Sequence, residues 1–311
     1  MMKNKILEIS PLQLSILCGL ISAAFSFSSA FIFHYPFFFI IFFALSYFWL
    51  TPILLVSLIH GSKYGLVSSL IVIGLDTLIA GPIPASLTLC TSLFPALYLT
   101  HLIQQKNNSN SFGLGAAVSR VCLVYLGLMV FALVFIFDAD TVKQTAASFI
   151  KTLSNANIPN HSISHLSESF IQLFPAFLCL STIISLIINI IVTLRLLGSI
   201  SPEIRPYFLA NDLRMPKFWD IIFLFGVLLL LTRHEMFAFI GKNVLLLSCL
   251  PLYLYGLSIV YGWLNRLENW LLWMIFTIIL SILLIWPAML VILLGLLGPI
   301  FRIQKDTNKS S

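Results

Sequence analysis

The chain has 311 residues, of which 59% are hydrophobic and only 9% are charged, and its formal net charge is +6. So little charge excludes a water-soluble domain, and the lack of a Lys/Arg cluster or an aromatic-interleaved basic stripe argues against nucleic acid as a partner. A hydrocarbon core of about 30 Å needs roughly 20 apolar helical residues per crossing, and runs such as residues 170–197 reach that length. We therefore expect an all-α protein, a polytopic membrane helical bundle with about eight transmembrane helices (range seven to nine).

Five closely spaced crossings are predicted in the first half of the chain, separated by short links that contain Gly, Pro, His or Ser. Their ranges are residues 12–33, 37–59, 65–80, 83–103 and 116–137. The first run is longer than the 7–15-residue apolar region of a signal peptide, so an uncleaved helix is favoured over cleavage near Ser28-Ser29-Ala30. After the fifth crossing, the helical spacing of apolar residues in 141–153 predicts a short helix that lies on the membrane surface or caps an opening.

A sixth crossing at residues 170–197 is followed by three apolar elements at 218–231, 244–263 and 270–300. The first of the three has only 14 residues, so it is the doubtful crossing, and eight crossings are favoured over nine. As one helix the last element would be about 45 Å long. We therefore expect a kink at Trp286-Pro287 or an end that protrudes into water.

The placement of charge and tryptophan predicts the orientation. With the amino terminus in the cytoplasm, nine Lys and Arg residues of the first six crossings lie inside and only Lys143 and Lys151 lie outside. The nine are Lys3, Lys5, Lys63, Lys106, Arg120, Arg195, Arg205, Arg214 and Lys217. Four tryptophans near element ends are expected at the membrane interface, namely Trp219, Trp263, Trp270 and Trp273. We expect a multi-pass protein of the bacterial inner membrane with a cytoplasmic amino terminus.

One integral membrane domain is predicted over residues 1–311. Within it we expect a six-helix core at 1–198, a cytoplasmic basic loop at 199–217, a C-terminal helical extension at 218–303 and a polar tail at 304–311.

The candidate substrate-binding residues lie in the third and sixth crossings. Asp76 is a carboxylate inside an apolar run, where ionisable groups are rare and face a cavity or a partner, although a position near the helix end would let it reach water. Ser181, Ser185 and Asn189 are spaced by four and share one helical face, which suits either a substrate-lining surface or hydrogen bonding between helices.

A stripe of small residues on the first helix is the candidate partner-docking face. Ser15, Gly19 and Ala23 recur at intervals of four and allow another helix to approach closely. The stripe serves either packing within the chain or docking of a separate membrane subunit.

Catalytic and cofactor motifs are lacking. The sequence has no Walker loop, GxSxG or GxGxxG pattern, so we predict no catalytic residues, no cofactor and no ATP hydrolysis by this chain alone. His161 and His165 are four residues apart with Glu168 close by, but no HExxH pattern accompanies them, and no metal site is predicted.

Several short motifs resemble the YybS-like family of uncharacterised multi-pass bacterial membrane proteins over residues 10–303. They are Gly19-Leu20-Ile21-Ser22-Ala23-Ala24, Leu93-Phe94-Pro95-Ala96, Leu213-Arg214-Met215-Pro216-Lys217-Phe218-Trp219, Leu296-Leu297-Gly298 and Phe301-Arg302. Pro299 departs from the acidic residue expected near that position. The family is distantly similar to the substrate-binding membrane subunits of energy-coupling-factor transporters. That resemblance implies six helices with cytoplasmic termini and docking through the first helix; the extra final third departs from it.

Three hypotheses for function follow. The first is a small-molecule-binding or transport-related subunit that lacks its own ATPase and depends on partner subunits. The second is a membrane scaffold or assembly factor without transport activity. The third is a lipid-modifying membrane enzyme, which would need His, Asp or Glu residues converging at one depth, whereas these residues are scattered here.

Overall fold

All regular secondary structure is helical in the residues that the computed structural model describes, which are 10–31, 39–107, 114–136, 160–200, 216 and 218–307. Seven helices in these ranges are long and apolar enough to cross a membrane, and eight are if a bent helix pair counts as one span. The seven spans are Pro11–Ser28, Ile41–His60, Ser62–Ala80, Pro82–Gln104, Gly115–Phe135, Gln172–Ser199 and Glu235–Leu264. The fold is a polytopic membrane helical bundle, as the hydropathy of the sequence predicts.

The chain divides into two compact units, and neither is one continuous stretch of sequence. Unit 1 comprises Met1–Phe112 and Ser181–Tyr207, and unit 2 comprises Gly113–Leu180 and Phe208–Ser311. The sequence-based division into a six-helix core and a C-terminal extension stays a prediction.

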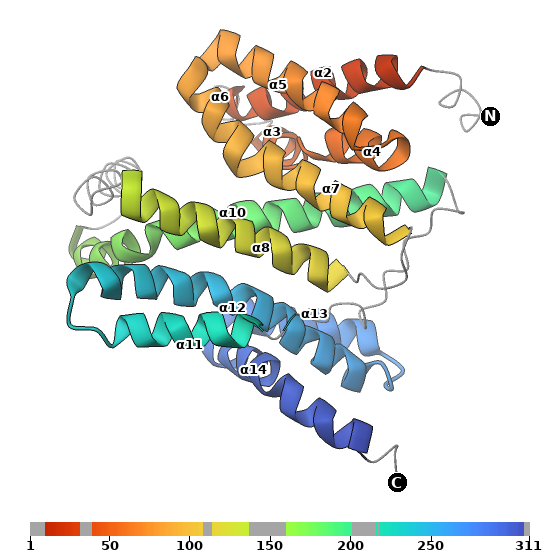
Figure 1. Cartoon of the computed structure of the whole chain (residues 1–311). Coiled ribbons are helices and arrows are strands. Elements are labelled where there is room, and N and C mark those ends of the chain that lie inside the picture. Colours follow the sequence, from red (N-terminus) through yellow and green to blue (C-terminus); the bar gives the residue numbers. More distant parts are fainter. Residues whose placement is uncertain are drawn as a thin grey trace. The chain divides into compact units, whose positions relative to one another are not determined.

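Seven helical segments from the described residues of the first third of the chain lie in unit 1 (Figure 1). They are α2 (Pro11–Phe31), α3 (Phe39–Tyr47), α4 (Thr51–His60), α5 (Ser62–Ala80), α6 (Pro82–Thr88), η2 (Leu89–Leu93) and α7 (Phe94–Asn107). α2 packs against α3, α4 and α5, while α4 packs against α5 and α7. Single glycines at positive φ, Gly61 at 106° and Gly81 at 95°, separate α4 from α5 and α5 from α6. Side chains rarely tolerate this conformation, so glycine permits one-residue turns between successive spans.

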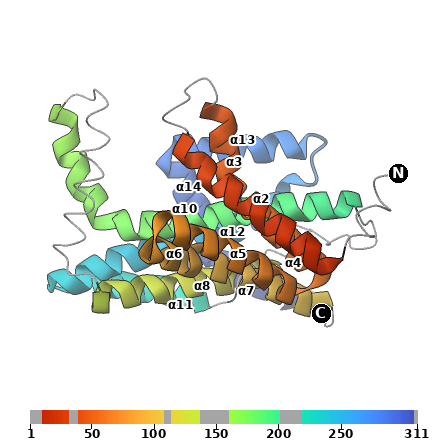
Figure 2. The same cartoon turned by 90° about the horizontal axis from the view of Figure 1, so that it is seen from above.

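One long helix, α10 (Asn160–Ile200), contributes to both units because the boundary between them falls at Ser181. It has 41 residues, of which Gln172–Ser199 form the membrane span. Pro175 lies inside the helix, and Figure 2 shows that α10 is bent, with a shorter N-terminal arm. A proline ring removes one backbone donor and clashes with the carbonyl four residues earlier, which accounts for a bend.

Unit 2 is organised around its longest span, α12. Its other elements are α8 (Leu114–Phe131), η3 (Ala132–Ile136), the N-terminal part of α10, α11 (Phe218–Leu230), α13 (Trp270–Leu283) and α14 (Ile285–Thr307), and α12 itself is Glu235–Leu264. α12 packs against α8, α11, α13 and α14. Small residues bring the α12 and α14 backbones into direct contact, because a Cβ built on Gly256 would overlap the Val291 carbonyl and one on Gly295 would overlap the Leu252 carbonyl.

Two predicted boundaries in the last third are corrected. α12 begins at Glu235, nine residues before the predicted start at Val244, because Asn243 is buried and Lys242 half-buried inside unit 2, where the helix continues. The 270–300 element breaks at Leu284, where the backbone is extended, rather than at Trp286-Pro287. The chain bends by 112° between α13 and α14. Pro287 cannot donate to the carbonyl at position 283, so the first helix ends there and the proline falls in the first turn of the next. α11, with 13 residues, is the short element that the sequence predicts.

The four tryptophans near element ends differ in burial, and their placement at a membrane interface stays a prediction. Trp263, Trp270 and Trp273 are 58%, 36% and 47% exposed. Trp219 is completely buried, and its indole N–H donates to the Ser119 hydroxyl on α8. A buried tryptophan needs such a partner for its N–H.

The predicted surface helix at 141–153 lies outside the described residues.

Candidate functional site

Asp76 lies in α5, one turn before the Gly81 turn, and only 6% of it is exposed. Its carboxyl group interacts with the Thr88 hydroxyl on α6, the helix that follows the turn. Asp76 therefore links the ends of two consecutive helices in unit 1. A substrate-binding role for it stays a prediction.

Asn189 is fully buried at the break between α3 and α4. Pro52 has no N–H, and the Thr51 N–H donates to the Phe48 carbonyl at 3.1 Å, so the Tyr47 carbonyl has lost its helical donor at position 51. The Asn189 carboxamide N–H donates to the Tyr47 carbonyl at 3.0 Å, and the Thr51 hydroxyl donates to the Asn189 amide oxygen at 2.8 Å. We call Tyr47, Thr51 and Asn189 the α3–α4 joint.

The other two residues of the predicted polar face take different positions. Ser185 is half-buried, and its carbonyl accepts a second hydrogen bond from the Asn189 carboxamide at 2.8 Å. Ser181 is exposed. Asn189 and Ser185 thus act together in hydrogen bonding between and within helices, whereas Ser181 is not part of the joint.

The small-residue stripe of α2 faces α5 within unit 1. Ser15 and Ala23 are 0% and 1% exposed, and the Ser68 hydroxyl donates to the Ser15 carbonyl at 2.7 Å. A Cβ at Gly19 would lie 2.9 Å from the Ser68 carbonyl oxygen and 3.0 Å from the Ile71 Cβ. These contacts favour packing within the chain, and a partner-docking role for the stripe stays a prediction.

A second joint, which the sequence analysis missed, lies at Pro175 of α10. In a regular helix the Gln172 carbonyl would accept from the Ala176 N–H. Here the Ala176 N–H donates to the Asn243 amide oxygen at 3.0 Å, and the Asn243 amide nitrogen donates to the Gln172 carbonyl at 2.9 Å. Asn243 is fully buried and also donates to the Phe239 carbonyl of its own helix at 2.9 Å. We call Gln172, Ala176 and Asn243 the α10 joint.

A cation lies next to the α10 joint. Lys242 is half-buried in α12, and its ammonium group donates to the side-chain oxygen of Gln172. The signal in the sequence is the pair Lys242-Asn243, which directly precedes the predicted start of this helix at Val244. α10 and α12 meet there through two polar side chains on α12 and one on α10.

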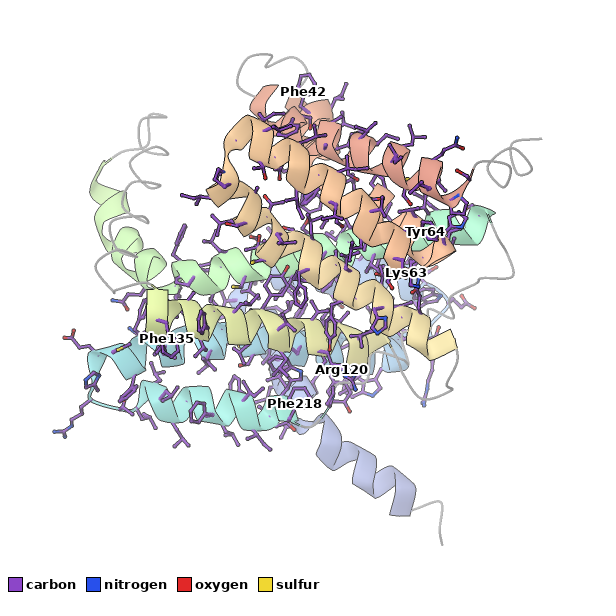
Figure 3. All side chains as sticks on the ribbon, turned by 45° about the horizontal axis from the view of Figure 1, so that its top comes forward. Phe42, Lys63, Tyr64, Arg120, Phe135 and Phe218 are labelled. Atoms are coloured by element: carbon purple, nitrogen blue, oxygen red, sulfur yellow. The ribbon has the colours of Figure 1, made fainter. Side chains whose placement is uncertain are left out.

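The Ser119–Trp219 hydrogen bond joins α8 to the start of α11 in unit 2. Figure 3 shows their neighbours, Arg120 on α8 and Phe218 at the start of α11, at the same end of α8, with Phe135 at the opposite end. α8 and α11 are thereby anchored to each other close to the start of both.

The chemistry available at these positions is hydrogen bonding and charge recognition. Among the described residues, no group of three or more His, Cys, Asp or Glu side chains could hold a metal ion. The side chains of His161, His165 and Glu168 lie outside the described residues. Carboxamides at helix breaks present oriented donors and acceptors, and Lys242 adds a positive charge.

Comparison with known proteins places the chain in a family. The family model described as "Predicted membrane protein (DUF2232)" matches residues 21–299. The chain belongs to this family. No curated protein and no solved structure matches it.

Proposed function

We propose that the protein is a small-molecule-binding, transport-related subunit of the bacterial inner membrane that lacks its own ATPase and works with partner subunits. The observation that carries the proposal is a pair of prolines inside membrane-spanning segments, one at the break between α3 and α4 and one at the bend of α10, each beside a fully buried asparagine that hydrogen-bonds to the nearby backbone. Irregular backbone in a membrane is tolerated where it is buried in protein or lines a cavity, and broken helices form the substrate sites of many secondary transporters.

The YybS-like resemblance supports the same proposal. Its distant similarity to energy-coupling-factor substrate-binding subunits supplies the expectation of separate energy-coupling partners, since the sequence has no Walker loop. Asp76, Ser181, Ser185 and Asn189 remain substrate-binding candidates in unit 1, and Gln172, Lys242 and Asn243 join them in unit 2. Fold analogy alone does not establish a function, so the proposal has to be tested by ligand binding.

Ligand-induced stabilisation tests the proposal. The full chain, purified in nanodiscs, is heated with B-group vitamins, amino acids, nucleobases and divalent metal ions. A true ligand at 100 times its Kd raises the unfolding free energy by about 2.7 kcal/mol. We expect one compound to raise Tm, with the increase reduced in Asp76→Asn or Ser185→Ala and unchanged in Ser199→Ala, an exposed residue that hydrogen-bonds within its own helix.

The absence of any stabilising compound together with the absence of a co-purifying subunit would overturn the proposal. A partner that co-purifies without any ligand would instead favour the scaffold hypothesis. Accumulation of one lipid species after deletion would favour the enzyme hypothesis.

Orientation has its own test. The amino terminus is proposed to be cytoplasmic on the basis of the Lys/Arg count, which places the start of the Gln172–Ser199 span on the outer side. The contact of Asn243 with Gln172 supports placing the turn at 231–234 on that outer side too, so α11, despite its 13 residues, carries the chain outward. A reporter fused at 231–234 should therefore be periplasmic and one at 265–269 cytoplasmic; the reverse pattern would contradict the assignment.

A further inference from the structure

Lys242 is a positive charge inside a membrane-spanning helix. It lies seven residues after Glu235, the first residue of α12, which is about 10 Å along the helix axis. It is half-buried, and its hydrogen-bond acceptor is a neutral amide, the side chain of Gln172. A cation in this environment is costly unless an anion accompanies it.

The ammonium group is held in place and still has donors to offer. A lysine ammonium has three N–H donors, and in the described part of the chain Gln172 accepts one of them. The amide of Asn243, the next residue, ties the same turn of α12 to the bend of α10. The charge therefore projects from a fixed turn rather than from a free chain end.

Nearby carboxylates of the described residues do not neutralise Lys242. Glu235 is exposed and two helical turns away, too far along the axis for an ion pair. Arg233, next to Glu235 in the turn before α12, is also exposed and offsets the charge of Glu235. The local balance favours an anionic group and disfavours a cation.

We propose that Lys242, positioned by Gln172 and Asn243, binds an anionic carboxylate or phosphate group at the bend of α10. The inference rests on the proposed function and names the class of ligand that would bind beside the α10 joint. In the proposed orientation Lys242 lies nearer the outer side of the membrane than the cytoplasmic side. The shared chemistry fits either a soluble anion or the phosphate of an anionic lipid headgroup.

The experiment uses the full chain in phosphatidylcholine nanodiscs, heated in increasing sodium phosphate or sodium succinate at an ionic strength kept constant with potassium chloride. We expect one of the two anions to raise Tm of the wild type by about 3–5 °C, Lys242→Met to abolish the rise and Lys242→Arg to keep most of it. Lys63→Met is the matched control, because Lys63 is an exposed lysine in the first turn of α5 (Figure 3), and it should respond like the wild type.

A second arm separates the two sources of the anion. Nanodiscs with 30% phosphatidylglycerol are compared with phosphatidylcholine alone. If the anionic lipid raises Tm of the wild type but not of Lys242→Met, while soluble anions have no effect, the occupant is a lipid headgroup.

Three results would overturn the inference. One is an equal response of the wild type and Lys242→Met to every anion and lipid. Another is a response that the wild type lacks and Glu168→Gln gains, which would make Glu168 of α10 the existing partner of Lys242. The third is a neutral compound that stabilises the wild type and Lys242→Met alike while no anion does; the proposed function would then stand and the anion site would not. If Lys242→Met fails to fold, Gln172→Leu replaces that variant in the experiment. Gln172→Leu keeps the charge of Lys242 but removes the hydrogen bond that positions it, so the increase in Tm with the anion should be smaller.

Discussion

At both joints an asparagine side chain hydrogen-bonds to backbone groups beside a proline, but the charge next to the asparagine differs. In unit 1, Asn189 bonds to the Tyr47 carbonyl and accepts from Thr51 beside Pro52. In unit 2, Asn243 bonds to the Gln172 carbonyl and to the Ala176 N–H beside Pro175. Each asparagine is fully buried and comes from a different helix than the one that is broken.

The difference lies in what surrounds the carboxamide. The α3–α4 joint is neutral, and its side-chain neighbours, a threonine and a serine, are themselves hydrogen-bonded. The α10 joint has Lys242 beside it, with a neutral acceptor. A carboxamide is therefore sufficient to satisfy the backbone groups beside a proline. The charge of Lys242 at the α10 joint needs another explanation, which the proposed anion site provides.

The largest effect is expected where the backbones of α12 and α14 touch in unit 2, and the looser contact of α2 with α5 in unit 1 provides the comparison. Gly256→Ala should lower the unfolding free energy by about 3 kcal/mol, because the new Cβ would overlap the Val291 carbonyl and the two backbones would have to separate. Gly19→Ala in unit 1 should cost only about 1 kcal/mol, since its Cβ would lie 2.9 Å from the nearest atom. SDS titration in mixed micelles measures both.

The controls for this pair are Gly262→Ala and Gly74→Ala, where no atom lies within 4 Å of the new Cβ. Both should leave stability unchanged or raise it by up to about 0.5 kcal/mol, as alanine favours a helix over glycine. Equal losses at Gly256 and Gly262 would show that α12 and α14 do not meet at Gly256.

Breaking the α10 joint should have the next largest effect. Asn243→Leu removes the partners of the Gln172 carbonyl and the Ala176 N–H, and we expect a loss of about 2.5 kcal/mol. In a Pro175→Ala background the helix can straighten and restore its own bond, so the loss should fall by about half. A double-mutant cycle measures this coupling, and strict additivity would mean that Asn243 does not compensate for the proline.

The α3–α4 joint should be slightly less sensitive. Asn189→Leu frees the Tyr47 carbonyl and the Thr51 hydroxyl, for an expected loss of about 2 kcal/mol. Because no charge adjoins this joint, the variant should keep the wild-type response of Tm to phosphate or succinate. If Asn189→Leu lost the response of Tm to the anion, anion binding would not be specific to the α10 joint.

The smallest effects are expected at isolated polar contacts. Trp219→Phe keeps an aromatic ring at this buried position but loses part of the indole volume and the hydrogen bond to Ser119, which together should cost about 1.5 kcal/mol. Thr100→Val in unit 1 loses the bond from the Ser57 hydroxyl, 2.9 Å long, and should cost about 0.5 kcal/mol because Ser57 can turn to its own helix. Thermal unfolding of both variants, with Trp273→Phe as an exposed control, would rank them.

Sequence reasoning found the membrane spans because their signal is local. Apolar runs, and breakers such as Gly61 and Gly81, act on the residues next to them, and the spans follow these signals. The break at Leu284 was placed two residues late because a proline disturbs the helix on its N-terminal side, up to four residues away.

The site was harder to predict because its contacts are remote in sequence. Asn189 was selected by its spacing, but its partner Tyr47 is 142 positions away, so its task at a helix break could not be read from its own helix. Asn243 and Lys242 were missed because a polar pair beside an apolar run predicts a helix end. Only the placement of α10 against α12 within unit 2 shows that they are covered.

The sharing of α10 between the units has a consequence for biosynthesis. The Tyr47 carbonyl enters the bilayer with the first spans, but its partner Asn189 is translated 142 residues later, which at 5–20 residues per second is roughly 7–30 s. During that interval the nascent chain carries an unsatisfied polar group in lipid, so the insertion machinery must shelter it until α10 emerges from the ribosome.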